Sequence, residues 1–235
     1  MEAIGFHDVQ IQTEIQINYK MQTLNIFETP VFIRQCEQNQ QVSDYVNREI
    51  IPAYLNRRAN QQNDQNGLSN VYSDFFEGAV KADQALLAKL YTPDIRSLMT
   101  HVGFKANVNW QIRPYFWYNI TEQGGSQDTH CHITGPQSVT FCAIHYVEFD
   151  GAEHTSAYFT NPQEQIIRST QPSEQPDMVP EYFKQLVKAP RITQGDIVFF
   201  PPWLKHTVAK QTSHKRRLTI AMNLSIFDGG GNEKS

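Results

Sequence analysis

Three histidines stand in two short stretches whose spacing suits metal binding. The first stretch, DTHCH at residues 128–132, holds His130 and His132, and the second, PPWLKH at residues 201–206, ends on His206. Side chains two apart on a strand point the same way, so both imidazoles of the first stretch can reach one ion. A third histidine would complete a set of three ligands and leave positions open for a substrate. The pattern predicts a catalytic metal centre, and the alternative is surface histidines in polar loops.

A basic residue and a hydroxyl residue follow on the last apolar segment. Arg217 and Thr219 begin RLTIAMNL and, being two apart, share one face of the expected strand. If residues 207–216 form a hairpin, this strand runs back beside the one that carries His206, and Arg217 points into the same cavity. A guanidinium binds a carboxylate through two parallel hydrogen bonds, and Thr219 would add a hydroxyl donor. We expect a carboxylate-binding subsite here, and the alternative for Arg217 is a solvated basic turn.

The elements that must position these residues differ between the two halves of the chain. The first half predicts two strands followed by helices that pack outside a β-rich core. These elements are strands over 9–17 and 24–33, the second interrupted near Pro30; a helix from Ser43 that Pro52 kinks or ends; a polar loop at 60–67; a helix over 77–91; and a helix capped by Thr92-Pro93 at its start and by Gly103 at its end.

The second half, from residue 105 to 227, is β-rich in composition and divided by turn signals such as Gly124-Gly125 and Gly195-Asp196. It predicts a β-barrel or sandwich. Residues 161–181 are rich in Gln, Pro and Ser and predict a long loop that acts as a lid. We therefore expect a single domain over 1–235, with supporting strands and helices in 1–104 and a flexible tail at 228–235.

Composition narrows the class of protein. The chain has 235 residues and a net charge of −4, which weighs against nucleic-acid binding. No apolar run approaches the roughly 18 residues of a membrane span, and the N-terminus lacks the basic start and apolar core of a secretory signal. Cys36, Cys131 and Cys142 do not make a disulfide framework. These features predict a cytoplasmic protein with reduced thiols.

Together, four segments carry a family resemblance. THCHITGPQSVTFCAIHYVEF, GDIVFFPPWLKHTV, RRLTIAMNL and the earlier LNIFETPVF resemble the 2-oxoglutarate/Fe(II)-dependent oxygenases. The resemblance is closest to a group of these oxygenases that carries H-x-H-P, then G-D-L-x-x-F-P-x-x-x-x-H, then R-x-S-x-x-x-N. It covers residues 24–32 and 105–227. It implies a double-stranded β-helix, a cupin-like jelly-roll barrel of antiparallel strands, with Fe(II) in its mouth and 2-oxoglutarate and O2 as cosubstrates.

The resemblance also implies roles for single residues. His130 and His206 match the two histidine ligands. Arg217 matches the residue that binds the far carboxylate of 2-oxoglutarate, and Thr219 matches the hydroxyl residue after it. His132 stands where the wider superfamily has aspartate, so three neutral imidazoles would leave the Fe(II) site at a charge of +2.

Two further positions remain candidates. Asp128 shares the expected strand face with the histidines and is either an alternative ligand or an acceptor for a histidine N–H. Tyr118, with Asn119 beside it, lies on a strand that would line the cosubstrate pocket, so Tyr118 is expected to hydrogen-bond 2-oxoglutarate; its alternative is a packing role. Trp110 and Trp203 are expected to pack.

The activity that the resemblance implies is hydroxylation of an unidentified substrate with release of succinate and CO2. Two alternatives stay open. A cupin-type dioxygenase or isomerase would not use 2-oxoglutarate; Gly124 lies at cupin-like spacing before His130, although the glutamate expected after His132 is missing. A non-catalytic β-barrel binding protein would hold little metal. Substrate identity is not readable from the sequence, and the strand at 9–17 pairs either within the barrel or across a homodimer.

Overall fold

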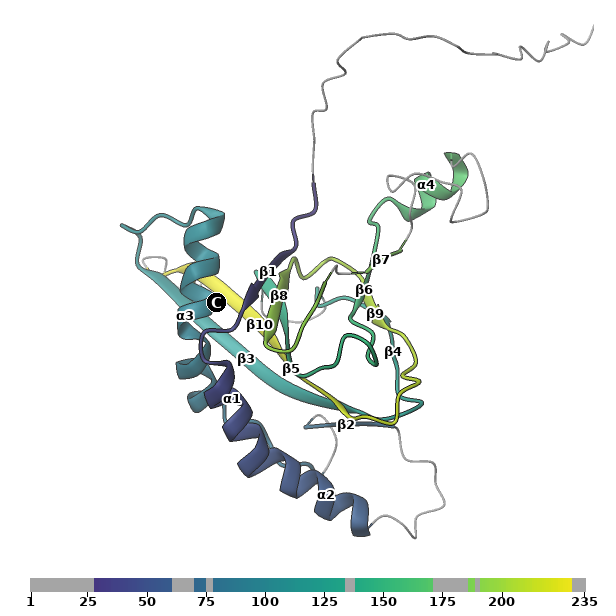
Figure 1. Cartoon of the computed structure of the whole chain (residues 1–235). Helices are drawn as coiled ribbons and strands as arrows, with labels where there is room; N and C mark the ends of the chain where they lie inside the picture. The colour runs from purple at the N-terminus through teal and green to yellow at the C-terminus, as the bar shows by residue number, and fades with distance from the viewer. Residues whose placement is uncertain are drawn as a thin grey trace, which may run out of the picture.

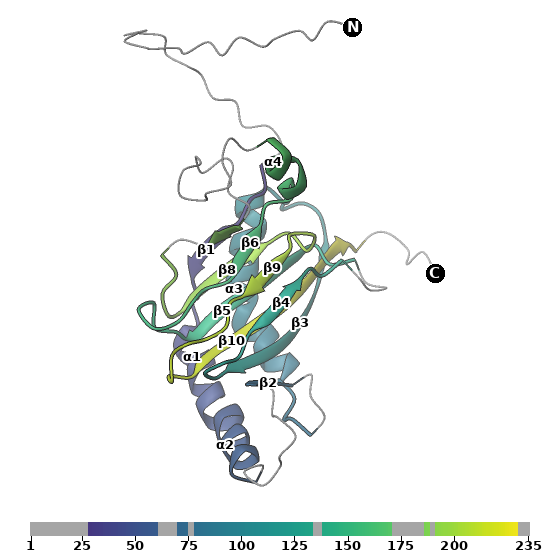
Figure 2. The ribbon, with the colours of Figure 1, turned by 90° about the vertical axis from the view of Figure 1, so that its right-hand side faces the viewer.

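The computed structural model describes residues 28–60, 70–74, 78–133, 138–170, 186–188 and 191–229. Two antiparallel sheets lie face to face, and helices cover the outer face of the larger sheet (Figure 1). The view turned by 90° shows the strands of both sheets in front of the longest helix (Figure 2). No helix within these described ranges is long and apolar enough to cross a membrane.

The larger sheet has six strands in the order β1-β8-β5-β10-β3-β2, and every neighbouring pair is antiparallel. Its strands are β1 (Phe32–Gln35), β2 (Val71–Ser73), β3 (Trp110–Thr121), β5 (Phe141–Glu148), β8 (Asp196–Phe200) and β10 (Arg217–Asp228). The central strands read as nearly continuous apolar runs because both of their faces are buried.

The smaller sheet has four strands in the order β4-β9-β6-β7. They are β4 (Gln127–His130), β6 (Tyr158–Thr160), β7 (Leu186–Lys188) and β9 (His206–Val208). Within the described residues no strand pairing joins the two sheets, so of the predicted barrel or sandwich they form an open jelly-roll sandwich. The double-stranded β-helix itself is confirmed.

Alternation along each strand divides the interior into two cores. Phe116, Tyr118 and Ile120 on β3 point to the helices, as do Leu218 and Ile220 on β10. On β5 and β8 the even-numbered side chains form the second core, between the sheets, and the odd-numbered ones join the first. The candidate site residues of β3 and β10 must therefore have odd numbers to face the smaller sheet.

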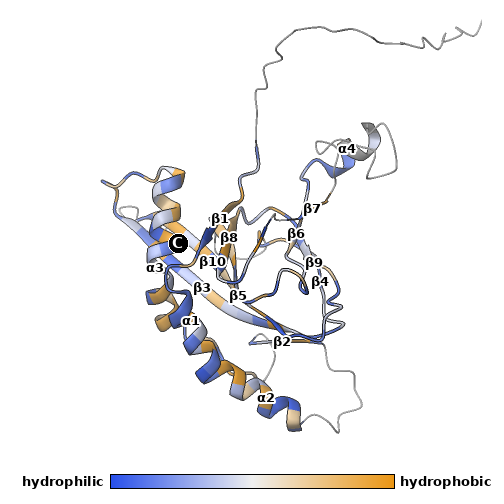
Figure 3. Ribbon diagram, viewed as in Figure 1, coloured by the Kyte–Doolittle hydropathy of each residue, from blue (hydrophilic) through white to orange (hydrophobic). Residues whose placement is uncertain are grey.

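The helices pack against the first core. They are α1 (Asn39–Tyr45), a π-helical turn (Val46–Ile50), α2 (Ile51–Asn60) and α3 (Gln84–Val102). Each carries apolar and hydrophilic residues along its length (Figure 3). The helical run starts before Ser43 and passes Pro52 by a change of hydrogen-bond register, the π-helical turn, without ending there.

Thr92-Pro93 does not start a helix, so that prediction was wrong. α3 begins instead at Asp83, whose side chain accepts a hydrogen bond from the Leu86 backbone N–H at 3.0 Å. Pro93 sits inside the helix, and burial of one apolar face over its whole length outweighs the missing hydrogen bond. Gly103 closes the helix with φ of 93°, as predicted, because a left-handed cap favours glycine.

Two other predictions are only partly covered by the structure. The strand predicted at 9–17 and residues 24–27 of the second predicted strand lie outside the described residues, and β1 begins after Pro30. The lid segment contains a short helix, α4 (Glu164–Thr170), where a loop was predicted, and 171–185 lie outside the description. The polar loop at 60–67 lies almost wholly outside it as well.

The turn after β3 carries the chain from the larger sheet to the smaller one. Gly124 has φ of 85°, which favours glycine, and its N–H donates to the Gln211 carbonyl at 2.7 Å. The Gln211 N–H in turn donates to the Gly125 carbonyl at 2.8 Å. This pair of bonds ties the start of β4 to the segment between β9 and β10 and so fixes where His130 lies.

A buried histidine behind the larger sheet makes stability depend on pH. His145 lies between α3 and the start of α1: the Tyr91 hydroxyl bonds its Nδ1 at 2.6 Å, and its Nε2 bonds Asn39 Oδ1 at 3.1 Å. Burial lowers the pKa of His145 to about 3. As the pH falls below about 6.5, His145 is protonated in the unfolded chain before it is protonated in the folded one. The free energy of unfolding therefore decreases as the pH falls.

We expect the free energy of unfolding of metal-free protein to fall below pH 6.5, with His145 contributing about 1.4 kcal/mol per pH unit. Urea unfolding at pH 7, 6 and 5 measures it. His145→Gln keeps a polar side chain but removes the titration, so its unfolding free energy should fall less steeply. Equal slopes in the two proteins would contradict the assignment.

Candidate metal centre

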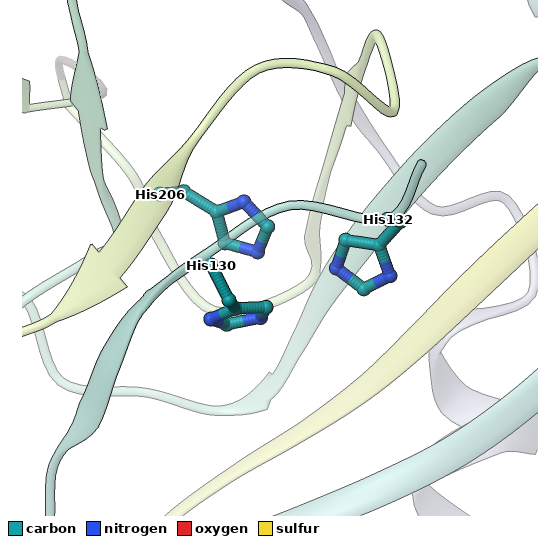
Figure 4. A group of neighbouring side chains, drawn as sticks. All are labelled: His130, His132 and His206. Carbon is teal, nitrogen blue, oxygen red and sulfur yellow. The ribbon is translucent and has the colours of Figure 1, made fainter. Parts of the chain in front are cut away.

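Strand pairing brings two of the three histidines directly together. His130 is the last residue of β4 and His206 the first of β9, and they are register partners in the smaller sheet. His132 lies two residues beyond β4, where its backbone N–H donates to the Pro202 carbonyl at 2.8 Å. The three imidazoles therefore reach one place from a strand end, a strand start and the loop between sheets, and they turn toward a common space (Figure 4).

The distances within this group fit one metal ion. One ring nitrogen of each histidine lies within 4.8 Å of those of the other two. The centroids of His130 and His206 are 4.3 Å apart, and each lies 5.2 Å from that of His132. Burial, and then the neighbouring His130, lowers the pKa of His132 and of His206 to about 4. Both rings are therefore neutral at pH 7, the form that binds a metal.

Backbone carbonyls fix which nitrogen faces the ion. The Nδ1 of His130 lies 2.7 Å from the Asp128 carbonyl, and the Nδ1 of His206 lies 3.1 Å from the Leu204 carbonyl. A carbonyl only accepts, so each Nδ1 carries the proton and each Nε2 is left with its lone pair for a metal. The Asp128 carboxylate is not part of the metal-binding group of the described residues; its backbone oxygen takes the acceptor role instead.

Asn223, which has no role in the sequence analysis, contacts the third imidazole, that of His132. Its side chain hydrogen-bonds His132, and this bond raises the pKa of that imidazole. Burial and the neighbouring His130 lower the same pKa by more. The Cys142 thiol donates to Asn223 Oδ1 at 3.4 Å. Asn223 lies an even number of positions after Arg217 on the same strand, so the alternation that pointed to Thr219 could also have identified it.

Replacing Asn223 by alanine should weaken metal binding about tenfold, because partners that orient a metal-bound imidazole contribute roughly that much. The measurement is a Mn(II) titration followed by electron paramagnetic resonance. Ser225→Ala, one position further along the same face of β10, is the matched control and should bind Mn(II) like the wild type. Equal affinity of the Asn223 variant would mean that Asn223 does not orient the ring.

Arg217 and Thr219 line the same cavity as the three histidines, together with Trp117, Asn119 and Gln127. Its empty volume, counted with the adjoining open solvent, is about 380 Å³. The strand pairing that brings Arg217 to the cavity differs from the predicted pairing. β10 does not form a hairpin with β9; it lies in the other sheet, between β5 and β3. Arg217 faces the cavity because the cavity lies between the sheets.

Among the described residues, the Arg217 guanidinium is a buried cation without an acidic partner. The residue is only 3% exposed, and its Nε has no hydrogen-bond partner in the structure as described. Its guanidinium carbon lies 5.4 Å from the ring centre of Tyr146. Burial lowers the pKa of Arg217, and the nearby Tyr146 raises it. No described carboxylate side chain lines the cavity, so it is suited to an anion.

Tyr118, like Asp128, is a predicted site residue that does not line the cavity. It is fully buried on the opposite face of β3, in the core beneath the helices, and its hydroxyl donates to the Val80 carbonyl at 2.7 Å. Its neighbours Trp117 and Asn119 line the cavity instead. The physical reason is strand parity: Asn119 is the register partner of Thr219, whereas Tyr118 pairs with Ile220.

Fold and site together define a jelly-roll protein with a three-histidine metal-binding group. Residues 115–223 match a family model described as "Putative 2OG-Fe(II) oxygenase". The resemblance seen in the sequence is thus confirmed over the segment that holds all three histidines, Arg217 and Thr219. No sequence match is found among curated proteins.

Solved structures of low sequence identity are similar to this chain, and the first of those named here shares its fold. EvdO2 from Micromonospora carbonacea var. aurantiaca is 10% identical, with 91% of this chain and 98% of that chain covered and a TM-score of 0.55. HygX from Streptomyces hygroscopicus, solved with nickel, 2-oxoglutarate and hygromycin B, is 11% identical over 84% and 83%, with a TM-score of 0.48. An oxidoreductase of the 2OG-Fe(II) oxygenase family from Burkholderia pseudomallei is 12% identical over 60% and 57%, with a TM-score of 0.42.

Proposed function

We propose that the protein is a 2-oxoglutarate- and Fe(II)-dependent dioxygenase. His130, His132 and His206 would hold the iron, and Arg217 with Thr219 would bind the far carboxylate of 2-oxoglutarate. When bound, Fe(II) and 2-oxoglutarate together activate O2 to oxidise a substrate C–H bond, with release of succinate and CO2. Hydroxylation is the outcome we expect for the substrate.

One observation carries this proposal: a buried arginine without an acidic partner in the described structure shares a cavity with the metal-binding group. Burying an unpaired guanidinium is costly, and the cost is offset when a carboxylate occupies the cavity. A dicarboxylic acid can satisfy the cation at one end and reach the imidazoles at the other. A cupin-type reaction without 2-oxoglutarate would leave the buried Arg217 without this role.

The surrounding residues set the protonation of the histidines and the access of water to the cavity. The backbone carbonyls of Asp128 and Leu204 keep the protons of His130 and His206 on Nδ1. Apolar side chains between the sheets, such as Phe200, exclude water from the cavity. His130 itself is exposed, so the metal-binding group remains accessible from solvent on that side.

The test is an anaerobic titration of the protein with Fe(II) and then with 2-oxoglutarate, watched for the visible charge-transfer band of the chelate. Admission of O2 should then convert 2-oxoglutarate to succinate, slowly even without substrate. Binding of both with succinate release supports a 2-oxoglutarate oxygenase. Iron binding without 2-oxoglutarate binding would favour the cupin-type reading, and binding of neither would favour a non-catalytic protein.

A further inference from the structure

One edge of the larger sheet lies open beside α3. β1 stands at the end of the strand order, and among the described strands only β8 pairs with it. Between β1 and α3 there is a hollow, which we call the edge pocket. It is lined by residues 31–34, by Ser97, Leu98 and His101 of α3, and by Phe199 of β8. Its empty volume, counted with the adjoining open solvent, is about 950 Å³.

The backbone of β1 offers hydrogen-bonding groups to its open side. The Cys36 N–H, directly after β1, donates to the Gly195 carbonyl at 2.9 Å, toward β8. Successive residues of an antiparallel strand alternate in direction. The Arg34 amide therefore also points to β8, and the amides of Ile33 and Gln35 point to the open side. An edge of this kind is a template for a further strand.

The walls of the edge pocket are largely apolar. Leu98 and Phe199 are buried there, and the Phe32 ring packs edge-on against His101 with centroids 5.4 Å apart. Ile33 lines the same pocket and is 41% exposed. A strand added at this edge would remove apolar surface from water and pair the open backbone groups at the same time.

Arg34 carries the fixed charge of the edge pocket, and ion pairs already occupy it. Its Nε lies 3.1 Å from Asp94 Oδ1, and its Nη2 lies 2.7 Å from Glu37 Oε1. Among the described residues its Nη1 has no hydrogen-bond partner. An acidic ligand would have to compete with both carboxylates for this guanidinium. The edge pocket therefore suits an apolar segment that brings backbone carbonyls as acceptors.

The chain itself enters the described fold at this pocket. The described residues begin at Glu28, and Val31 already lines the pocket. The strand predicted at 9–17 precedes them and lies outside the described residues. Strands that follow one another in a chain are neighbours in space roughly two-thirds of the time. Since β8 occupies one side of β1, the open side is the place left for the preceding strand.

Residues 9–17 match the edge pocket in polarity and in reach. Valine or isoleucine stands at positions 9, 11, 15 and 17, and glutamine or glutamate at positions 10, 12, 14 and 16. A strand with this alternation covers apolar surface with one face and meets water with the other. Residues 18–27 span roughly 30 Å when extended, which lets the segment turn back along β1.

We propose that residues 9–17 of the same chain dock in the edge pocket as a further antiparallel strand beside β1. The valine and isoleucine face covers the pocket, and the glutamine face meets solvent. The covalent connection holds the segment at a high local concentration, which favours the same chain over a second copy. This inference does not depend on the proposed function.

The test is native-state hydrogen exchange of single backbone amides, followed by NMR on the full-length protein. The amides of Ile33 and Gln35 should exchange slowly in the wild type. Ile11→Asp/Ile15→Asp places two carboxylates against the apolar pocket and should speed exchange at both amides at least about tenfold, because their hydrogen bonds are lost. The Arg34 amide, which points to β8, should stay protected and so reports that the fold is intact.

The matched control is Gln12→Asp/Gln16→Asp. It adds the same two carboxylates to the opposite face of the predicted strand, so protection of Ile33 and Gln35 should equal that in the wild type. Fast exchange of these two amides in the wild type would overturn the proposal. Equal protection in the wild type and the Ile11→Asp/Ile15→Asp variant would overturn it as well.

Dilution distinguishes the same chain from a second copy. Protection at Ile33 that is independent of protein concentration, with a monomer in sedimentation analysis, supports docking within one chain. Protection that disappears on dilution, together with a dimer at high concentration, would assign the edge pocket to the segment of a second copy and contradict the proposal.

Discussion

Arg217→Met lowers the affinity for 2-oxoglutarate by about a hundredfold or more while Fe(II) still binds. Truncating one partner of a buried charge pair costs a large part of the binding energy, and here the lost partner is the only described charged side chain that lines the cavity. The metal-free variant should be as stable as the wild type or more so, because an unpaired buried cation is replaced by an apolar side chain of similar length. Anaerobic titration and urea unfolding measure the two effects.

Arg216→Met is the matched control for this experiment. Arg216 is the preceding residue, but it points to the other side and makes two hydrogen bonds with Glu148, at 2.6 and 2.8 Å. Its loss removes a partly exposed ion pair and should leave 2-oxoglutarate affinity unchanged. Equal affinity in the wild type and the Arg217 variant would remove the main support for 2-oxoglutarate as the cosubstrate.

His206→Ala abolishes tight metal binding, with a loss of at least about a hundredfold in affinity. Changes to partners that only orient a metal ligand already cost 10- to 100-fold, and His206 is the most buried of the three histidines. Equilibrium dialysis against Mn(II) or Fe(II), followed by elemental analysis, gives the affinity. The variant should also lose the charge-transfer band that Fe(II) and 2-oxoglutarate produce together.

His154→Ala provides the comparison for His206. His154 is similarly buried, but its Nδ1 accepts from the Asp150 backbone N–H and its Nε2 bonds the Lys215 carbonyl, outside the metal-binding group. It should keep full metal affinity even if it loses stability. Tight binding of one metal ion per chain by the His206 variant would show that the ion lies elsewhere.

Much of the site could be predicted from local pattern alone. The motifs identify His130 and His206 as candidate site residues. The two-residue repeat of a strand predicts that Arg217 and Thr219 share one face. The face that each strand turns to the cavity could not be read locally. In β3 both faces are buried, so composition does not separate Tyr118 from Asn119; their parity is set by pairing with β10, about a hundred residues away.

The errors in the fold have a similar origin. Thr92-Pro93 is a good local start signal, but the apolar face that runs through α3 continues across it and overrides the local preference. The hairpin predicted at 207–216 does not form, because the chain passes there from the smaller sheet to the larger one. Packing between the two sheets, which local sequence does not report, determines this crossing. Signals confined to one turn, such as Gly103, were read correctly.

The pairing of His130 with His206 has a consequence for how the protein would acquire the proposed metal ion. These two rings meet only when β4 and β9, far apart along the chain, have joined in one sheet. A nascent or unfolded chain therefore offers at most the H-x-H pair and holds an ion weakly, so loading follows folding. A bound ion would join β4 to β9 in the smaller sheet, so the melting temperature should rise with the concentration of free metal.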